Sequence, residues 1–67
     1  MELKVNGRKT PFDGEKLQEL LARFDLDPDA QGVAVAVNGE VVARAEWRAR
    51  ALRDGDAVEI VRAVQGG

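Results

Sequence analysis

The residues best suited to chemistry lie at the carboxyl end of the sequence, where an apolar run passes into two glycines. Val64 and Gln65 lead into Gly66 and Gly67, whose α-carboxyl group is the last group of the sequence. Because glycine has no Cβ, a chain that ends this way is slim and conformationally free. The three residues after Val64 can extend about 10 Å, at about 3.3–3.6 Å each. We therefore predict an extended reactive tail, residues 64–67, that carries the Gly67 carboxylate into the active site of another protein.

The composition excludes most chemistry by the side chains of this protein. The 67 residues include neither cysteine nor histidine, which removes disulfides, thiol nucleophiles, imidazole bases and most transition-metal sites. A chain of this length forms one domain that buries only about 60% of its unfolded surface, which leaves little room for a deep active site. We expect a protein that is not itself an enzyme and that permanently binds no cofactor and no metal.

Charge and hydropathy indicate a soluble, cytoplasmic protein. Ten basic and twelve acidic residues give a net charge of −2, which predicts no strong attraction to nucleic acid. Met1–Val5 begins no apolar stretch of signal-peptide length, and no run approaches the length of a membrane span. Acidic residues gather in the first half and arginines after residue 43, which fits either two solvated faces or charge-steered docking.

Two strand pairs are predicted, each joined by an Asn-Gly turn. Residues 2–6 alternate between apolar and polar, as in a half-buried strand, and residues 8–12 return beside them. Residues 33–37 and 40–42 repeat the arrangement with β-branched residues. Pro11 cannot donate a ladder hydrogen bond, so its strand belongs at a sheet edge. The two turns, at Asn6-Gly7 and Asn38-Gly39, suit type I′ geometry.

A helix of about three turns is predicted between the strand pairs. Asp13 is the expected N-cap, and Pro28 prevents the helix from continuing far beyond Phe24. The apolar side chains recur at i, i+3, i+4 and i+7, which is typical of an amphipathic helix that covers a sheet. This stripe consists of Leu17, Leu20, Leu21 and Phe24.

The rest of the chain crosses back and ends in a strand. Residues 45–52 lack a clean stripe and are predicted to form a short helical turn or an irregular crossing, in which Trp47 joins the edge of the core. Asp54-Gly55-Asp56 is a turn, and its two acids are too few for a metal loop. In the final strand, residues 58–64, Val58 and Ile60 face the core and Val61 is exposed. Because this strand is apolar almost throughout, we expect it at the centre of the sheet.

These elements assemble into one α+β domain that spans residues 1–67. A mixed sheet of four to five strands packs on one main helix, and the late central strand lies beside the first one. This order of elements indicates a β-grasp topology.

Several motifs of the sequence, taken together, resemble the sulfur carrier proteins of thiamin biosynthesis, which have a ubiquitin-like β-grasp fold. The resemblance covers nearly the whole chain, although the family usually has Pro where this chain has Ala43. The motifs are Val5-Asn6-Gly7, the Leu-x-x-Leu-Leu of residues 17–21, residues 35–42, Arg44, Trp47, Asp54-Gly55-Asp56 and Val64-Gln65-Gly66-Gly67.

The resemblance implies a reaction at Gly67. A ubiquitin-activating-type adenylyltransferase would use ATP and Mg²⁺ to adenylate this carboxylate, which is ionised near pH 7 because an α-carboxyl has a pKa of about 3.3–3.7. Sulfur supplied through a cysteine desulfurase would convert the adenylate to a thiocarboxylate for use by a thiazole synthase. Val64, Gln65 and Gly66 would thread into the partner active sites. Val61 and Arg62 are candidates for partner docking.

Three other functions remain open at this point. The small subunit of molybdopterin synthase is similar in fold, tail and chemistry but has a different sulfur acceptor. A ubiquitin-like modifier would be conjugated to lysine side chains. A non-catalytic β-grasp interaction module would have an inert tail.

Overall fold

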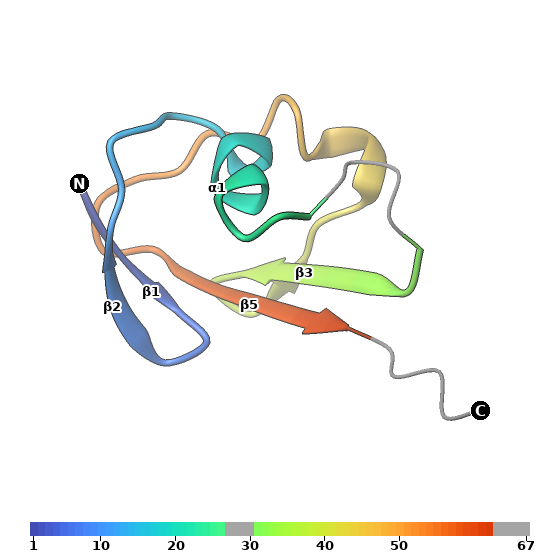
Figure 1. Ribbon diagram of the computed structural model, residues 1–67, viewed down its shortest axis with the longest axis horizontal. Helices are drawn as coiled ribbons and strands as arrows, with labels where there is room; N and C mark the ends of the chain where they lie inside the picture. The colour runs from blue at the N-terminus through green and yellow to red at the C-terminus, as the bar shows by residue number, and fades with distance from the viewer. Residues whose placement is uncertain (27–30, 63–67) are drawn as a thin grey trace.

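A mixed sheet packed on one face by a short helix forms the part of the chain that the computed structural model describes, residues 1–26 and 31–62 (Figure 1). The first four strands form two antiparallel hairpins with the helix between them, and a fifth strand follows the second hairpin. The elements are β1 Glu2–Val5, β2 Arg8–Pro11, α1 Leu17–Arg23, β3 Val33–Val37, β4 Glu40–Val41, the 3₁₀ helix η1 Arg44–Glu46, and β5 Ala57–Arg62.

The strand order in the sheet is β2-β1-β5-β3-β4, so the last strand lies at the centre. β1 and β5 are parallel, and the other neighbours are antiparallel. β2 occupies an edge, as its Pro11 requires. The predicted β-grasp arrangement, with a mixed sheet of four to five strands, is therefore confirmed, and five strands are present in the described residues. The central position of β5 beside β1 is confirmed as well.

Both predicted Asn-Gly turns are present, at the tips of the β1–β2 and β3–β4 hairpins. The φ angles are +50° at Asn6 and +83° at Gly7, and +52° at Asn38 and +83° at Gly39. A type I′ turn requires positive φ at both central residues, and asparagine and glycine tolerate that region best. The two turns are thus nearly identical in backbone conformation.

The core lies between the inner face of the sheet and α1. Alternate residues of β1, β3 and β5 point toward the helix, whose leucines are completely buried. Ile60 and Val33 are partly buried and pack against this cluster. The buried residues are Leu3, Val5, Phe12, Leu17, Leu20, Leu21, Leu26, Val35, Val37, Val42, Trp47, Leu52 and Val58.

The start of α1 differs from the prediction that Asp13 is its N-cap. The helix begins at Leu17, and the N-cap is Lys16, whose N–H donates to the Glu19 carboxylate at 3.1 Å. The residues before Leu17 are held extended by the crossing segment: Lys16 forms a β-bridge with Ala51, and the Leu17 N–H donates to the Arg50 carbonyl. A residue fixed in a bridge has extended backbone angles, so the helix cannot begin earlier.

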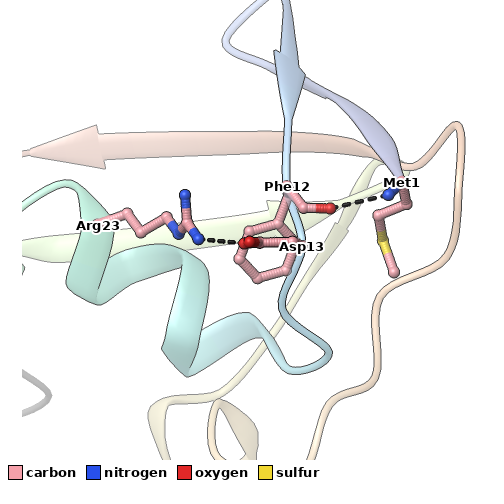
Figure 2. A network of polar contacts seen from close by, with 4 residues as sticks. All are labelled: Met1, Phe12, Asp13 and Arg23. Carbon is pink, nitrogen blue, oxygen red and sulfur yellow. Dashed lines mark hydrogen bonds and ion pairs between the residues drawn. The ribbon is translucent and has the colours of Figure 1, made fainter.

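Asp13 instead links the segment between β2 and α1 to the end of the helix. Its carboxylate accepts a hydrogen bond from the Arg23 guanidinium, which also lies over the Phe12 ring, 5.5 Å from its centroid (Figure 2). The terminal amino group of Met1 donates to the Phe12 carbonyl at 2.8 Å. These contacts surround Phe12, which is buried.

The predicted end of the apolar stripe is also wrong. Phe24 is the C-cap of α1 and is 39% exposed, so it does not belong to the core. Phe12 and Leu26 fill that end of the core from the segments that flank the helix. The helix is too short for the predicted stripe, because it has seven residues and ends at Arg23. The side chain of Phe24 therefore leaves the buried face.

The crossing from β4 to β5 is irregular, as predicted. Trp47 follows η1 and is buried, and its indole N–H donates to the Val42 carbonyl at 3.0 Å. In the turn at residues 54–56, the Asp54 carboxylate accepts from the Glu2 N–H and the Asp56 carboxylate accepts from the Arg53 N–H. The two acids therefore stabilise backbone at the start of β1 and in the turn that precedes β5.

Candidate functional site

β5 carries the chain out of the centre of the sheet and ends at Arg62. The predicted reactive residue Gly67 and the predicted threading residues Val64, Gln65 and Gly66 lie outside the described residues. The part of the site that the structure does describe is therefore the strand that precedes the tail, together with the surface around its end.

β5 is supported unequally by its two neighbours. β3 pairs with it from Val37 opposite Val58 to Val33 opposite Arg62. β1 pairs with it only at Ala57 and Val58. Beyond Val58, on the side of β1, the side chain of Asn6 contacts Ile60.

The face of the sheet away from α1 carries an apolar patch beside the end of β5. Val61, which is 60% exposed, lies opposite Ala34 on β3. Ala36 lies opposite Val41, which is 80% exposed, on β4. We call Ala34, Ala36, Val41 and Val61 the outer patch. Cross-strand partners share a face, so these four side chains form one surface.

The other half of the same face is charged. Lys4 of β1 lies opposite Lys9 of β2, and Glu2 lies opposite Pro11. On the patch side, Glu59 lies opposite Ala36. The apolar surface thus lies on the side of the sheet formed by β3, β4 and β5. An exposed apolar surface with small alanines allows the backbone of a partner to approach closely, which suits docking by another protein.

The two predicted docking residues lie on opposite faces of β5. The exposure expected for Val61 is confirmed. Arg62 points the other way, and its guanidinium donates to the Phe24 carbonyl at the end of α1, with an N–O distance of 3.2 Å. This bond ties the end of β5 to the C-cap of the helix, where a cation is favourable. Docking through Arg62 stays a prediction.

No prediction from the sequence includes Ala34, Ala36 or Val41 in a docking surface. The signal was present in the alternation of residues 33–37, where valines face the core and alanines face outward. What the sequence does not show is that β4 and β5 flank this strand and bring Val41 and Val61 to the same surface.

Neither a metal cluster nor a membrane span is found in the described part of the chain. Among residues 1–26 and 31–62, no three acidic side chains lie close enough together to hold a metal ion. No helix there is long and apolar enough to cross a bilayer.

Comparison with known proteins places the chain among close relatives. Residues 3–67 match the sequence model of the ThiS family. The chain is 41% identical to the sulfur carrier protein ThiS of Thermus thermophilus over 63 residues, which cover 94% of this chain and 95% of that protein. It is 33% identical to the sulfur carrier protein ThiS of Escherichia coli over 54 residues, 81% of this chain and 79% of that one.

A longer protein and a solved structure extend the comparison. The chain is 36% identical over its full length to a segment that makes up 20% of a thiazole synthase from Paramagnetospirillum magneticum. The crystal structure of the thiamine biosynthesis protein ThiS from Geobacter metallireducens superposes with a TM-score of 0.80 at 38% identity, with complete coverage of both chains. The family model, the Thermus thermophilus carrier and the superposed crystal structure all match nearly the whole chain, and the chain belongs to the ThiS family.

Proposed function

We propose that this protein is a sulfur carrier of thiamin biosynthesis whose reactive group is the Gly67 carboxylate. The observation that carries the proposal is the extent of the family match, which runs to residue 67 and so includes Gly66 and Gly67. Two curated relatives match most of this chain over most of their own length, and both are sulfur carrier proteins. In this role the chain is a protein cosubstrate that partner enzymes charge and discharge.

The chemistry begins with activation of the carboxylate. A carboxylate does not accept a sulfur nucleophile, because the leaving group would be an oxide. Attack of a Gly67 oxygen on the α-phosphate of ATP releases pyrophosphate and leaves an acyl-adenylate, from which AMP departs readily. ATP and Mg²⁺ are bound by the activating adenylyltransferase in this proposal, and not by the carrier.

Sulfur then replaces AMP. The terminal sulfur of a persulfide, formed by a cysteine desulfurase, attacks the acyl carbon and forms an acyl disulfide as AMP leaves. A second cysteine thiol of the partner enzymes then attacks the cysteine sulfur of this acyl disulfide. The S–S bond breaks, which leaves a thiocarboxylate at Gly67 and a disulfide between the two cysteines of the enzymes. Because the carrier has no cysteine, no thiol of its own competes for the activated carbonyl.

The acceptor and the docking surface follow from separate observations. A segment of a thiazole synthase resembles this entire chain, which supports a thiazole synthase as the partner that takes the sulfur.

The outer patch includes a residue of the strand that leads to the tail, so an enzyme that docks there is close to the residues that follow Arg62. Val61 is the residue of that strand that belongs to the outer patch, and it is 60% exposed.

Intact-protein mass spectrometry tests the proposal. The chain is incubated with ATP, Mg²⁺, a ubiquitin-activating-type adenylyltransferase, a cysteine desulfurase and cysteine. We expect a mass increase that corresponds to one oxygen replaced by sulfur, localised to Gly67 by fragmentation. Addition of a thiazole synthase with its other substrates should return the mass to that of the carboxylate.

Deletion of Gly67 provides the matched control, because it moves the terminal carboxylate back by one residue, to Gly66, and leaves the described residues unchanged. We expect no charging of this variant and an unchanged melting temperature. Sulfur on the shortened chain, or on any residue other than Gly67, would exclude the proposed reaction. A thiocarboxylate that the thiazole synthase does not consume would instead point to another acceptor, such as molybdopterin synthase.

A further inference from the structure

The two strands that flank β5 end at different points along it. β3 accompanies β5 as far as Arg62, whereas the last residue of β1, Val5, lies opposite Val58. The chain then turns away at Asn6-Gly7. Ile60 is the next residue of β5 whose backbone N–H and C=O point toward β1, and it lies beyond the end of that strand.

The side chain of Asn6 fills the place of the missing strand residue. Its Oδ1 accepts from the Ile60 N–H at 2.8 Å, and its Nδ2 donates to the Ile60 carbonyl at 3.3 Å. A carboxamide has the same donor and acceptor as a peptide group, so the side chain continues the parallel ladder by one step. The Asn6 N–H also donates to the Val58 carbonyl at 2.8 Å.

Asn38 has the same turn position and almost the same φ angle, but it holds the opposite end of β5. Its Oδ1 accepts from the Ala57 N–H at 3.0 Å, and its Nδ2 donates to the Asp56 carboxylate at 2.9 Å. The two turn asparagines therefore bind the same strand at its two ends, and only Asn6 binds the half that leads to the tail.

We propose that Asn6 is a positioning residue for the reaction at Gly67, because its amide holds Ile60, two residues before the end of β5 at Arg62, on the side that β1 no longer covers. The inference rests on the proposed function. An enzyme that docks on the outer patch must receive the tail at a defined distance and direction, and misplacement of a reacting group by about 1 Å can lower a rate as much as 100-fold. Loss of the two hydrogen bonds from the Asn6 side chain leaves the outer patch intact but frees the Ile60 backbone on the side of β1.

Steady-state kinetics of adenylation, with the carrier as the varied substrate, test this role in Asn6→Gly. Glycine preserves the turn, since it accepts positive φ, and removes only the amide. We expect kcat to fall roughly tenfold while KM for the carrier changes less than about twofold. Hydrogen exchange followed by NMR should show the Ile60 amide exchanging roughly tenfold faster, because its acceptor is gone.

Asn38→Gly is the matched control, because it makes the same substitution in the equivalent turn. We expect faster exchange at the Ala57 amide, unchanged exchange at Ile60, and a kcat within about twofold of the wild type. Circular dichroism melts establish that both variants are folded at the assay temperature.

The outcomes separate this inference from the proposed function. A wild-type chain that forms no adenylate overturns the proposed function, and the role of Asn6 with it. If the wild type is charged, an unchanged kcat in Asn6→Gly, an equal loss of kcat in both variants, or a rise in KM alone overturns the role of Asn6 and leaves the carrier function standing.

Discussion

The two faces of the sheet are built from alternate residues of the same strands, yet they differ in size of side chain and in exposure. On the inner face, Val35, Val37 and Val58 are at most 1% exposed and lie against the leucines of α1. On the outer patch, Val41 and Val61 are 80% and 60% exposed, and the residues between them are alanines.

In this small domain the inner face of the sheet serves the stability of the fold, and the outer patch serves interaction with other proteins. Burial of apolar surface stabilises the fold by about 25 cal/mol per Å², and the inner face supplies most of that area. The outer patch contributes little to folding while it remains exposed, so its residues can be chosen for transient contact. Substitutions on the two faces should therefore affect different measurements.

The largest effect is expected for truncation on the inner side. Leu20 of α1 is completely buried, so Leu20→Ala should destabilise the fold by about 2–5 kcal/mol through lost burial and a cavity. Urea unfolding followed by circular dichroism measures the change. Val41→Ala is the outer-face control, and its cost should stay within about 0.5 kcal/mol. Equal losses in the two variants would contradict the distinction between the faces.

A smaller effect, on binding rather than folding, is expected for Val61→Asp. A charge in the outer patch must be desolvated when a partner docks, so affinity for the activating enzyme should fall about tenfold or more. The cost in stability should not exceed about 1 kcal/mol, which is the range of strand propensity. Isothermal titration calorimetry and thermal melts measure the two quantities.

Lys9→Gln is the control for the preceding variant, because it also changes the net charge by one unit but lies on the charged half of the same face. Its affinity for the enzyme should match that of the wild type. Unchanged binding by Val61→Asp would remove the outer patch from the docking surface, and an equal effect of the two substitutions would indicate a general influence of charge.

The smallest effect on stability is expected for Asp13→Ala, which removes the ion pair with Arg23 at the end of α1. The Asp13–Arg23 pair has side chains that are 84% and 54% exposed, and exposed pairs contribute about 0–1 kcal/mol. Unfolding in low and high salt measures the contribution, which should vanish at about 1 M salt because exposed charges are then screened. A larger loss that persists in high salt would indicate a helix cap, contrary to the structure.

Local patterns in the sequence were sufficient for most of the architecture. Alternation identified β1, and β-branched residues identified β3 and β4. The Asn-Gly pairs identified both hairpin turns, and the apolar character of β5 identified it as central. Trp47 was predicted to join the edge of the core, and it is buried. These features depend on backbone preferences and burial at neighbouring positions, which a short segment contains within itself.

Long-range contacts decided what those patterns could not. Asp13 satisfies the preferences of an N-cap, but the bridge between Lys16 and Ala51 delays the helix to Leu17. The partner of the Asn6 side chain, Ile60, is 54 residues away. The members of the outer patch come together only because β5 inserts between β1 and β3. The sequence by itself determined the strands, the turns and the family of the chain. Only the tertiary structure decided where the helix begins and which side chains surround the strand that leads to the tail, because those contacts join residues that no local pattern connects.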